Sequence, residues 1–298
     1  MKSIEELIAA AKAKGRRRVV VAAAQEHSVL EAVYAAWKEG LAEPILVGDL
    51  AAIDAIAAEL GIDLGAFERH QAPDFAKAAA KAVEIVRSGG GDVLMKGLLD
   101  TSILLKAVLN KESGINAGRL TSHVAVLESP HYHKLFIVTD AAINIAPDLD
   151  GKIDIIANAV AAAKAIGVAR PKVALLTAVE KVNHAKMPCT VDAAILSTMN
   201  RRGQIKDCLV DGPLALDNAI SAESARIKKI DSPVAGDADI LVAPDIEAGN
   251  ILYKALMDLG GAKGAAVVMG AAKPIVLTSR ADPAETKLAS IALAALAS

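Results

Sequence analysis

The sequence contains little cysteine and few aromatic side chains. Its 298 residues include two cysteines, Cys189 and Cys208, which form no CxxC pair. This pattern indicates neither a disulfide framework nor a structural zinc site, and we expect a cytoplasmic protein. Aromatic residues make up only 2% of the chain, whereas 53% of it is hydrophobic. The core must therefore be filled by Ala, Val, Ile and Leu, as in alternating layers of strands and helices.

The chain also lacks an excess of one charge and any long apolar run. Its 33 basic and 35 acidic residues give a net charge of -2 and are spread along the sequence, so there is no electrostatic footprint for nucleic acid. The longest apolar runs, such as Val19 to Ala24, fall far below the roughly 20 residues that span a bilayer. The first residues place acids before the basic cluster, the reverse of a secretory signal. We expect a soluble protein without nucleic-acid or membrane partners.

Two phosphate-binding fingerprints are missing as well. No GxGxxG follows a predicted strand, and no GxxxxGK[ST] occurs. Their absence argues against Rossmann-type nicotinamide dehydrogenases and P-loop kinases, although dehydrogenases with other nucleotide sites remain an alternative. The histidines lack matched ligand spacing, so no metal site is predicted at His123, His131, His133 or His184.

A regular alternation of strand-sized apolar runs and helical segments is present throughout. Ser28 to Glu31, for example, has the spacing of a capping box at the start of a helix. Strands separated by helices predict mostly parallel sheets with right-handed crossovers. Because the chain exceeds the size of one growing core, we expect two α/β domains. Their predicted bounds are 1–138 plus 276–298 for the first domain and 139–275 for the second.

Small or polar residues gather where predicted strands end, the edge at which open α/β sheets build ligand sites. TDAAINIAP, residues 139–147, supplies Asp140 and Asn144. In VDGPLALDNAIS, residues 210–221, a strand is predicted to end at Asp211, where Gly212-Pro213 turns the chain. Solvated turns and helix caps are the alternative interpretation of both motifs.

A third strand end, Ala243-Pro244-Asp245, precedes a predicted Ala248-Gly249-Asn250 turn that opens a helix bearing Tyr253 and Lys254. Unpaired amides at a helix N-terminus bind anionic groups, so the segment predicts a phosphate site. Alternatively, Gly249 serves only the turn, Asn250 is an N-cap and Tyr253 fills the core.

At a fourth strand end, Thr278-Ser279-Arg280 follows a predicted strand over Ile275 to Leu277. A hydroxyl and a guanidinium emerge there together, and the donor fork of arginine suits phosphate oxygens. The alternative is a surface arginine beside an N-capping Ser279 or Asp282. The last helix is predicted to start at Pro283, near an N1 position.

Taken in order, TDAAINIAP, VDGPLALDNAIS, VAGDADILVAPDIEAGNILYK and GAAKPIVLTSR resemble the signature of the phosphate acetyl/butyryl transferase family. MKGLLDTSILLKAVL, residues 95–109, and AGRLTSHVAVLE, residues 117–128, extend the resemblance and are closer to the butyryl branch. The resemblance implies an isocitrate/isopropylmalate dehydrogenase-like fold of two α/β domains with a cleft between them, and a homodimer. It also implies transfer of a short, butyryl-like acyl group between coenzyme A and inorganic phosphate, giving acyl phosphate.

The resemblance further implies roles for individual residues. Ser279 matches the serine that stabilises the transition state, and Arg280 the neighbouring arginine that binds substrate. Acetyl-transferring members carry an aspartate base seven residues beyond the serine, where this chain has Thr286, so Glu285 and Asp282 are the candidate bases. The candidate substrate-binding residues are Asn144, Asp140, Asp245, Gly249, Asn250, Tyr253, Lys254, Arg119, Lys96 and Thr101.

Arginines of the acetyl branch are also replaced. Asp258 stands where one would follow the Tyr253-Lys254 pair, and Lys106 is the only basic residue between Asp100 and Leu109. This difference favours a butyryl-type enzyme. A phosphate acetyltransferase, or a non-catalytic relative that binds coenzyme A and phosphate, is the alternative. Coenzyme A is expected as a substrate, with no tightly bound cofactor.

Overall fold

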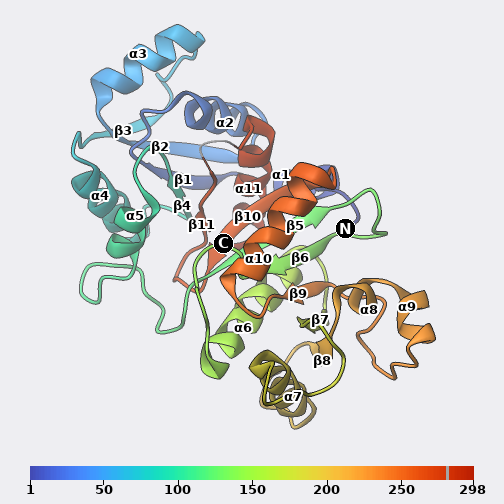
Figure 1. Cartoon of the computed structure of the whole chain (residues 1–298). Coiled ribbons are helices and arrows are strands. Elements are labelled where there is room, and N and C mark those ends of the chain that lie inside the picture. The colour runs from blue at the N-terminus through green and yellow to red at the C-terminus, as the bar shows by residue number, and fades with distance from the viewer. Residues whose placement is uncertain (280–281) are drawn as a thin grey trace. The chain divides into compact units, whose positions relative to one another are not determined.

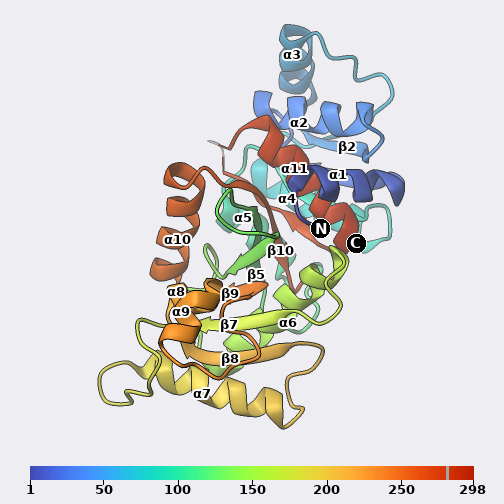
Figure 2. The same ribbon diagram turned by 90° about the vertical axis from the view of Figure 1, so that its right-hand side faces the viewer.

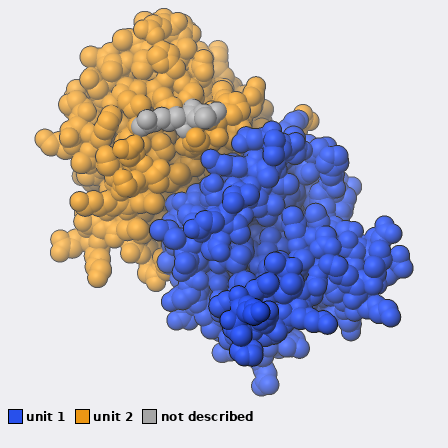
Figure 3. All heavy atoms as spheres, viewed as in Figure 1, with its two compact units in different colours: residues 1–4, 120–264 blue, residues 5–119, 265–298 orange. Residues whose placement is uncertain are grey.

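The computed structural model describes residues 1–279 and 282–298. The described chain divides into two compact units (Figure 3), of which unit 1 comprises residues 1–4 and 120–264, and unit 2 comprises residues 5–119 and 265–298. Both units combine strands with helices, which confirms the predicted α/β class. Three ranges, residues 1–4, 120–138 and 265–275, lie in the other unit from the one that the predicted domain bounds would give them. The domain division itself remains a prediction.

Unit 2 contains a sheet whose strands follow the order β3-β2-β1-β4-β11-β10. The strands from β3 to β11 in this order are parallel, and β10 runs antiparallel to β11. The elements are α1 (Ile4–Ala13), β1 (Arg17–Ala22), α2 (His27–Lys38), β2 (Ala42–Gly48), α3 (Leu50–Leu60), β3 (Glu68–Gln71), α4 (Phe75–Arg87), β4 (Val93–Lys96), α5 (Thr101–Val108), β10 (Lys263–Met269), β11 (Ile275–Val276) and α11 (Ala284–Ala297).

The core of unit 2 is built from small aliphatic residues. Val19, Val20 and Val21 of β1 are fully buried, as expected for a parallel strand covered on both faces. Helix α11 runs beside α2 (Figures 1 and 2), and its residues from Ala289 to Leu296 are all buried. Alanines at many of these positions allow the helix to pack closely, and a core with few aromatic residues results.

Unit 1 contains a second set of strands in the order β5-β6-β9-β7-β8. Strands β5 and β6 pair antiparallel, and the remaining pairs are parallel. The elements are β5 (Ser122–Glu128), β6 (Phe136–Thr139), α6 (Leu149–Ala165), β7 (Lys172–Leu176), α7 (Pro188–Arg201), β8 (Leu209–Leu214), α8 (Leu216–Ile220), α9 (Ala222–Ile227), β9 (Ile240–Val242), α10 (Ile246–Lys254) and the π-helix η1 (Ala255–Leu259).

Two predicted local features of the backbone are wrong. Helix α2 begins at His27 after Glu26, and Ser28 donates to the Glu26 carboxylate, so no capping box forms there. Strand β8 continues past Asp211 to Leu214, and the predicted turn at Gly212-Pro213 is absent. Glycine is required at this position of the strand, because the Cβ of any other residue at Gly212 would lie only 2.8 Å from Leu175 Cβ.

The helical predictions after β8 also need correction. The sequence pattern predicts one helix from Leu216 to Ala225. The segment instead forms α8 and α9, and the Ser221 side chain caps the second of these. Pro283 is the N-cap of α11 and does not occupy its first helical position. The short strand β3 was not predicted, because its sequence ERHQ has no buried residue and thus no apolar pattern.

Candidate functional site

The carboxyl ends of three parallel strands meet at one edge of unit 2. Ala22 of β1 is paired with Lys96 of β4, and Val276 of β11 with Met95 of β4. Ser279 lies three residues beyond the end of β11 and is exposed. Open α/β sheets commonly bind ligands at this edge. Lys96, at the end of β4, and Ser279, just after β11, therefore lie where a ligand site is expected.

The side chain of Lys96 is directed at the backbone of its own loop. It is 7% exposed, and its Nζ donates to the carbonyls of Gly97 at 3.1 Å and Leu99 at 3.3 Å. A Cβ at Gly97 would lie 2.0 Å from the Ala23 carbonyl oxygen, so only glycine allows this approach of β4 to β1. Lys96 therefore helps to hold the loop that leads to Thr101, the first residue of α5.

Ser279 belongs to a short segment with several backbone contacts. Its amide donates to Asp282 Oδ2 at 2.7 Å, and its carbonyl accepts from the Asp282 amide at 3.2 Å and from Lys287 Nζ at 3.2 Å. Lys287 Nζ also donates to the Asp282 carbonyl at 2.6 Å. Both backbone polar groups of Ser279 are thus held. Arg280 lies outside the described residues.

The candidate bases have different environments. Asp282 uses one carboxylate oxygen to hold the Ser279 amide. Glu285 is exposed in the first turn of α11, whereas Thr286 is buried and 8% exposed. Glu285 therefore has the most accessible carboxylate of this segment.

In unit 1, Asp140 and Asn144 form a closed turn after β6. Asp140 is 3% exposed, and its carboxylate accepts from the amides of Ala142, Ile143 and Asn144 and from Asn144 Nδ2 at 2.6 Å. Asn144 Nδ2 also donates to the Thr121 carbonyl at 2.9 Å. These contacts give Asp140 and Asn144 a structural role in shaping the turn.

The predicted turn at Ala248-Gly249-Asn250 is wrong. Asp245 caps α10 by accepting from the Ala248 amide at 2.9 Å, so the helix already begins at Ile246 and contains Gly249 and Asn250. A Cβ at Gly249 would lie 2.2 Å from the Asp140 carbonyl oxygen. The glycine is therefore required for the contact of α10 with the Asp140 turn and not for a turn of its own.

Further contacts join α10 to the same region of unit 1. Asn250 Nδ2 donates to the Ala141 carbonyl at 2.9 Å, and the Tyr253 ring meets His123 edge-on with centroids 5.7 Å apart. Lys254, the last residue of α10, is exposed, as is Arg119 of unit 2. The structure thus groups Asp140, Asn144, Asp245, Gly249, Asn250 and Tyr253 within unit 1, and Lys96, Thr101, Ser279, Asp282 and Glu285 within unit 2.

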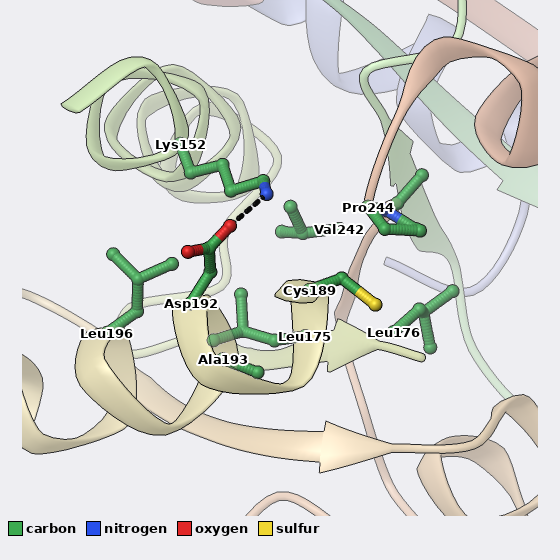
Figure 4. Close-up of a pocket in the computed structure, with 10 residues that line it drawn as sticks. Lys152, Leu175, Leu176, Cys189, Asp192, Ala193, Leu196, Val242 and Pro244 are labelled. Carbon is green, nitrogen blue, oxygen red and sulfur yellow. Dashed lines mark hydrogen bonds and ion pairs between the residues drawn. The ribbon is translucent and has the colours of Figure 1, made fainter. Parts of the chain in front are cut away.

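A small hollow in unit 1 lies between α6, α7 and the carboxyl ends of β7 and β9 (Figure 4). An ion pair of 2.6 Å joins Lys152 Nζ to Asp192 Oδ2 at this hollow, and Cys189 is beside it. Leu175, Leu176, Leu196 and Val242 supply much of the remaining wall. Because the pair satisfies both charges, the hollow offers mainly apolar contacts.

Two residues with notable environments were missed by the sequence-based reasoning. Lys152 is 6% exposed and Lys287 is 1% exposed. The signal for Lys287 was its place in the first turn of a helix that is otherwise composed almost entirely of Ala, Leu and Ile. A lysine within such an apolar helix needs polar partners from outside that helix.

The second cysteine is unsuited to nucleophilic chemistry. Burial, together with the nearby Asp207 carboxylate, raises the pKa of the Cys208 thiol to about 11. Since the thiolate is the reactive form, little of the nucleophile exists at neutral pH. Its sulfur instead contacts the Lys206 carbonyl.

Neither a metal cluster nor a membrane-spanning helix is found in the described residues. Within residues 1–279 and 282–298, no three His, Cys, Asp or Glu side chains gather in a way that could hold a metal ion. In the same ranges, no helix has both the length and the apolar character that crossing a membrane requires.

Comparisons with known proteins cover almost the entire chain. The family model described as phosphate acetyl/butaryl transferase matches residues 3–79 and 73–295. A phosphate butyryltransferase from Clostridium acetobutylicum is 51% identical over 296 residues, covering 99% of this chain and 98% of that protein. A phosphate acetyltransferase from Thermotoga maritima is 47% identical, with 98% and 99% covered.

A solved structure agrees with this result. The crystal structure of a branched-chain phosphotransacylase from Enterococcus faecalis V583 matches with a TM-score of 0.81 and 35% identity, covering 94% of this chain and 99% of that one. The predicted family and the predicted acyltransferase class are both confirmed. The chain belongs to the phosphate acetyl/butaryl transferase family.

Proposed function

We propose that this protein moves a short, butyryl-like acyl group between coenzyme A and inorganic phosphate. The observation that carries the proposal is the 51% identity, over nearly the full length of both chains, to the C. acetobutylicum phosphate butyryltransferase. In one direction the coenzyme thiolate attacks the acyl phosphate carbonyl, so that a C–S bond forms and the C–O bond to phosphate breaks. In the reverse direction a phosphate oxygen attacks the thioester and the coenzyme thiolate leaves.

This reaction makes three demands on the protein. A base must take the thiol proton, because a free thiol with a pKa near 8.5 is only slightly ionised at neutral pH. Hydrogen-bond donors must stabilise the tetrahedral oxyanion, and cations must hold the phosphate. We assign the oxyanion role to Ser279 and phosphate binding to Arg280, with Lys254, Arg119 and Lys96 as further cations.

For the base, the contacts favour Glu285 over Asp282. The Asp282 carboxylate accepts the Ser279 amide, and taking up a proton would weaken that bond. Glu285 is exposed in the first turn of α11. We therefore propose Glu285 as the proton acceptor and Asp282 as a support for the serine.

The proposed substrate-binding residues of unit 1 divide in a similar way. The Asp140 and Asp245 carboxylates hold backbone amides, and the Asn144 side chain donates to the Thr121 carbonyl. We propose that these three residues shape the site. Gly249, Asn250 and Tyr253 are proposed to line it, and Thr101 of unit 2 is a further proposed substrate-binding residue. An isocitrate/isopropylmalate dehydrogenase-like fold, a homodimeric state and a cytoplasmic location are also part of the proposal.

The test is an assay of purified protein with acetyl-, propionyl- and butyryl-coenzyme A plus phosphate, in which thiol release is followed. We expect butyryl-coenzyme A to give the highest kcat/KM. Each methylene is worth only about 1 to 3 kcal/mol in such a pocket, so slower turnover of the shorter substrates is expected. Release that is fastest with acetyl-coenzyme A would instead support a phosphate acetyltransferase, the second candidate favoured by the T. maritima relative. No release with any of the three would favour a non-catalytic relative.

A further inference from the structure

Lys287 is buried at an unusual position in α11. It is the fourth residue of the helix and is 1% exposed. Lysine is almost never fully buried unless its charge has partners, and a cation in the first turn of a helix is opposed by the helix dipole. When a sequence departs from such local preferences, the position is often a functional one.

Two partners of the Lys287 ammonium in the described chain precede the helix. Its Nζ donates to the Asp282 carbonyl at 2.6 Å and to the Ser279 carbonyl at 3.2 Å. Side chains in a helix lean toward its N-terminus, so a long side chain in the first turn reaches back to the preceding segment. A buried ammonium is tolerated where carbonyl oxygens replace its water, and two carbonyls do so here.

These contacts complete a frame around the backbone of Ser279. The Asp282 carboxylate holds the Ser279 amide at 2.7 Å, and the Asp282 amide and Lys287 ammonium hold its carbonyl. The amide and the carbonyl of one residue together determine how its backbone is oriented. The direction of the Ser279 side chain consequently depends on Lys287, although the lysine belongs to the next helix, eight residues further along the chain.

We propose that Lys287 is a positioning residue for acyl transfer, which fixes the Ser279 segment so that the serine hydroxyl is presented to the developing oxyanion. The inference rests on the proposed function of Ser279. It assigns Lys287 no contact with either substrate. Preorganised donors lose much of their effect when they are displaced by as little as about 1 Å, with rate losses of the order of a hundredfold.

The test compares Lys287→Met with Lys14→Met. Methionine keeps most of the length and the apolar stem of lysine but removes the ammonium. Lys14 is a matched control, because its Nζ donates to the Leu296 carbonyl at 2.9 Å, near the opposite end of α11. We expect Lys287→Met to lower kcat at least tenfold with KM for acyl-coenzyme A nearly unchanged, since the lost interaction belongs to the transition state. Lys14→Met should keep the parental kcat.

A double variant separates positioning from a general structural effect. If Lys287 acts through Ser279, Ser279→Ala combined with Lys287→Met will be no slower than Ser279→Ala alone, because residues that act as a unit are not additive. Lys287→Arg, which retains donors and charge, should recover part of the rate. Far-UV circular dichroism and thermal unfolding establish that each variant is folded. If the methionine variant does not fold, the same kinetic comparisons are made with Lys287→Gln.

Three results would overturn the inference: a folded Lys287 variant with kcat within twofold of the parent, rate losses that multiply in the double variant, or an equal loss in Lys14→Met. The proposed function fails in a different way. If Ser279→Ala retains the parental rate, the assigned role of the serine is wrong, and the inference built on it falls as well. A slow Ser279→Ala beside a fast Lys287→Met rejects the inference alone.

Discussion

The Asp140 turn of unit 1 and the Ser279 backbone of unit 2 each follow a strand that is parallel to one neighbour and antiparallel to the other, yet they are held by different means. The Asp140 carboxylate accepts hydrogen bonds from three successive backbone amides and from one side-chain amide, all within four residues of Asp140. Ser279 relies on one carboxylate and on an ammonium from the following helix. The contacts of the Asp140 carboxylate are all local, whereas the Ser279 backbone also depends on an ammonium supplied by α11. The Ser279 segment should therefore respond more strongly to changes made outside it.

The largest expected effect comes from Ser279→Ala. Removing a preorganised oxyanion donor should lower kcat by about a hundredfold to a thousandfold, or roughly 3 to 4 kcal/mol, with little change in melting temperature. Steady-state kinetics with butyryl-coenzyme A and phosphate provide the measurement, and Ser113→Ala, at an exposed serine, is the control. If Ser279→Ala turns over within about threefold of the parent, the Ser279 segment is no more important for catalysis than the Asp140 turn.

Gly249→Ala should act on the Asp140 turn through packing. The new Cβ would lie 2.2 Å from the Asp140 carbonyl oxygen, so helix and turn must separate, at an expected cost of about 1 to 3 kcal/mol in the free energy of unfolding. Urea denaturation measures this loss. In the control Gly65→Ala the nearest atom is the side-chain oxygen of Asp63 at 3.1 Å, which can move aside. Equal stability of the two variants would argue against the close contact.

The smallest expected effect is a change in acid stability at an ion-pair network of unit 1. This network compares contacts between charged side chains with the hydrogen-bonded turns above. Asp237 pairs with Lys134 at 2.8 Å, Lys172 at 2.7 Å and His133 at 3.0 Å. Burial tends to raise the pKa of Asp237, but the hydrogen bonds from Lys134 and Lys172 outweigh it and lower the pKa to about 2. Since this folded-state value lies below the ordinary 3.8, the contribution to stability is present above pH 3.8 and is lost as the pH falls toward 2.

Asp237→Asn should reduce that acid sensitivity slightly, because the aspartate is partly exposed and its pairs are screened by solvent. Thermal unfolding followed between pH 2 and pH 6 gives the comparison, with Asp231→Asn as the control at an exposed aspartate. Parallel pH profiles for the parent and Asp237→Asn would contradict the assigned pairing.

Much of the secondary structure could be predicted because its signals are local. The sequence pattern predicts a helix over Leu50 to Leu60, and α3 has those bounds, with Asp49 as its N-cap and Gly61 in the left-handed conformation at its end. The apolar run from Lys172 to Leu176 predicts a strand, and β7 has the same bounds. Caps and apolar periodicity act within a few residues, so no knowledge of distant contacts was needed.

The errors arose where local signals competed or where distant contacts decided the outcome. Gly249-Asn250 looks like a turn, but Asp245 offers an earlier cap, and the glycine is required by the carbonyl of Asp140. Likewise, the sequence contains no sign that the Lys287 ammonium would bind the carbonyls of Ser279 and Asp282. Motif resemblance could nominate Ser279, but the residues that support it depend on tertiary structure.

The unequal environments of the two cysteines provide a practical means of observing unit 1. Cys208 is buried and its thiol resists ionisation, whereas Cys189, at the second position of α7, is only half-buried. A maleimide fluorophore should therefore attach preferentially at Cys189 without prior removal of either thiol. Its emission would report on the hollow beside the Lys152–Asp192 pair while acyl-coenzyme A and phosphate are added to the native sequence.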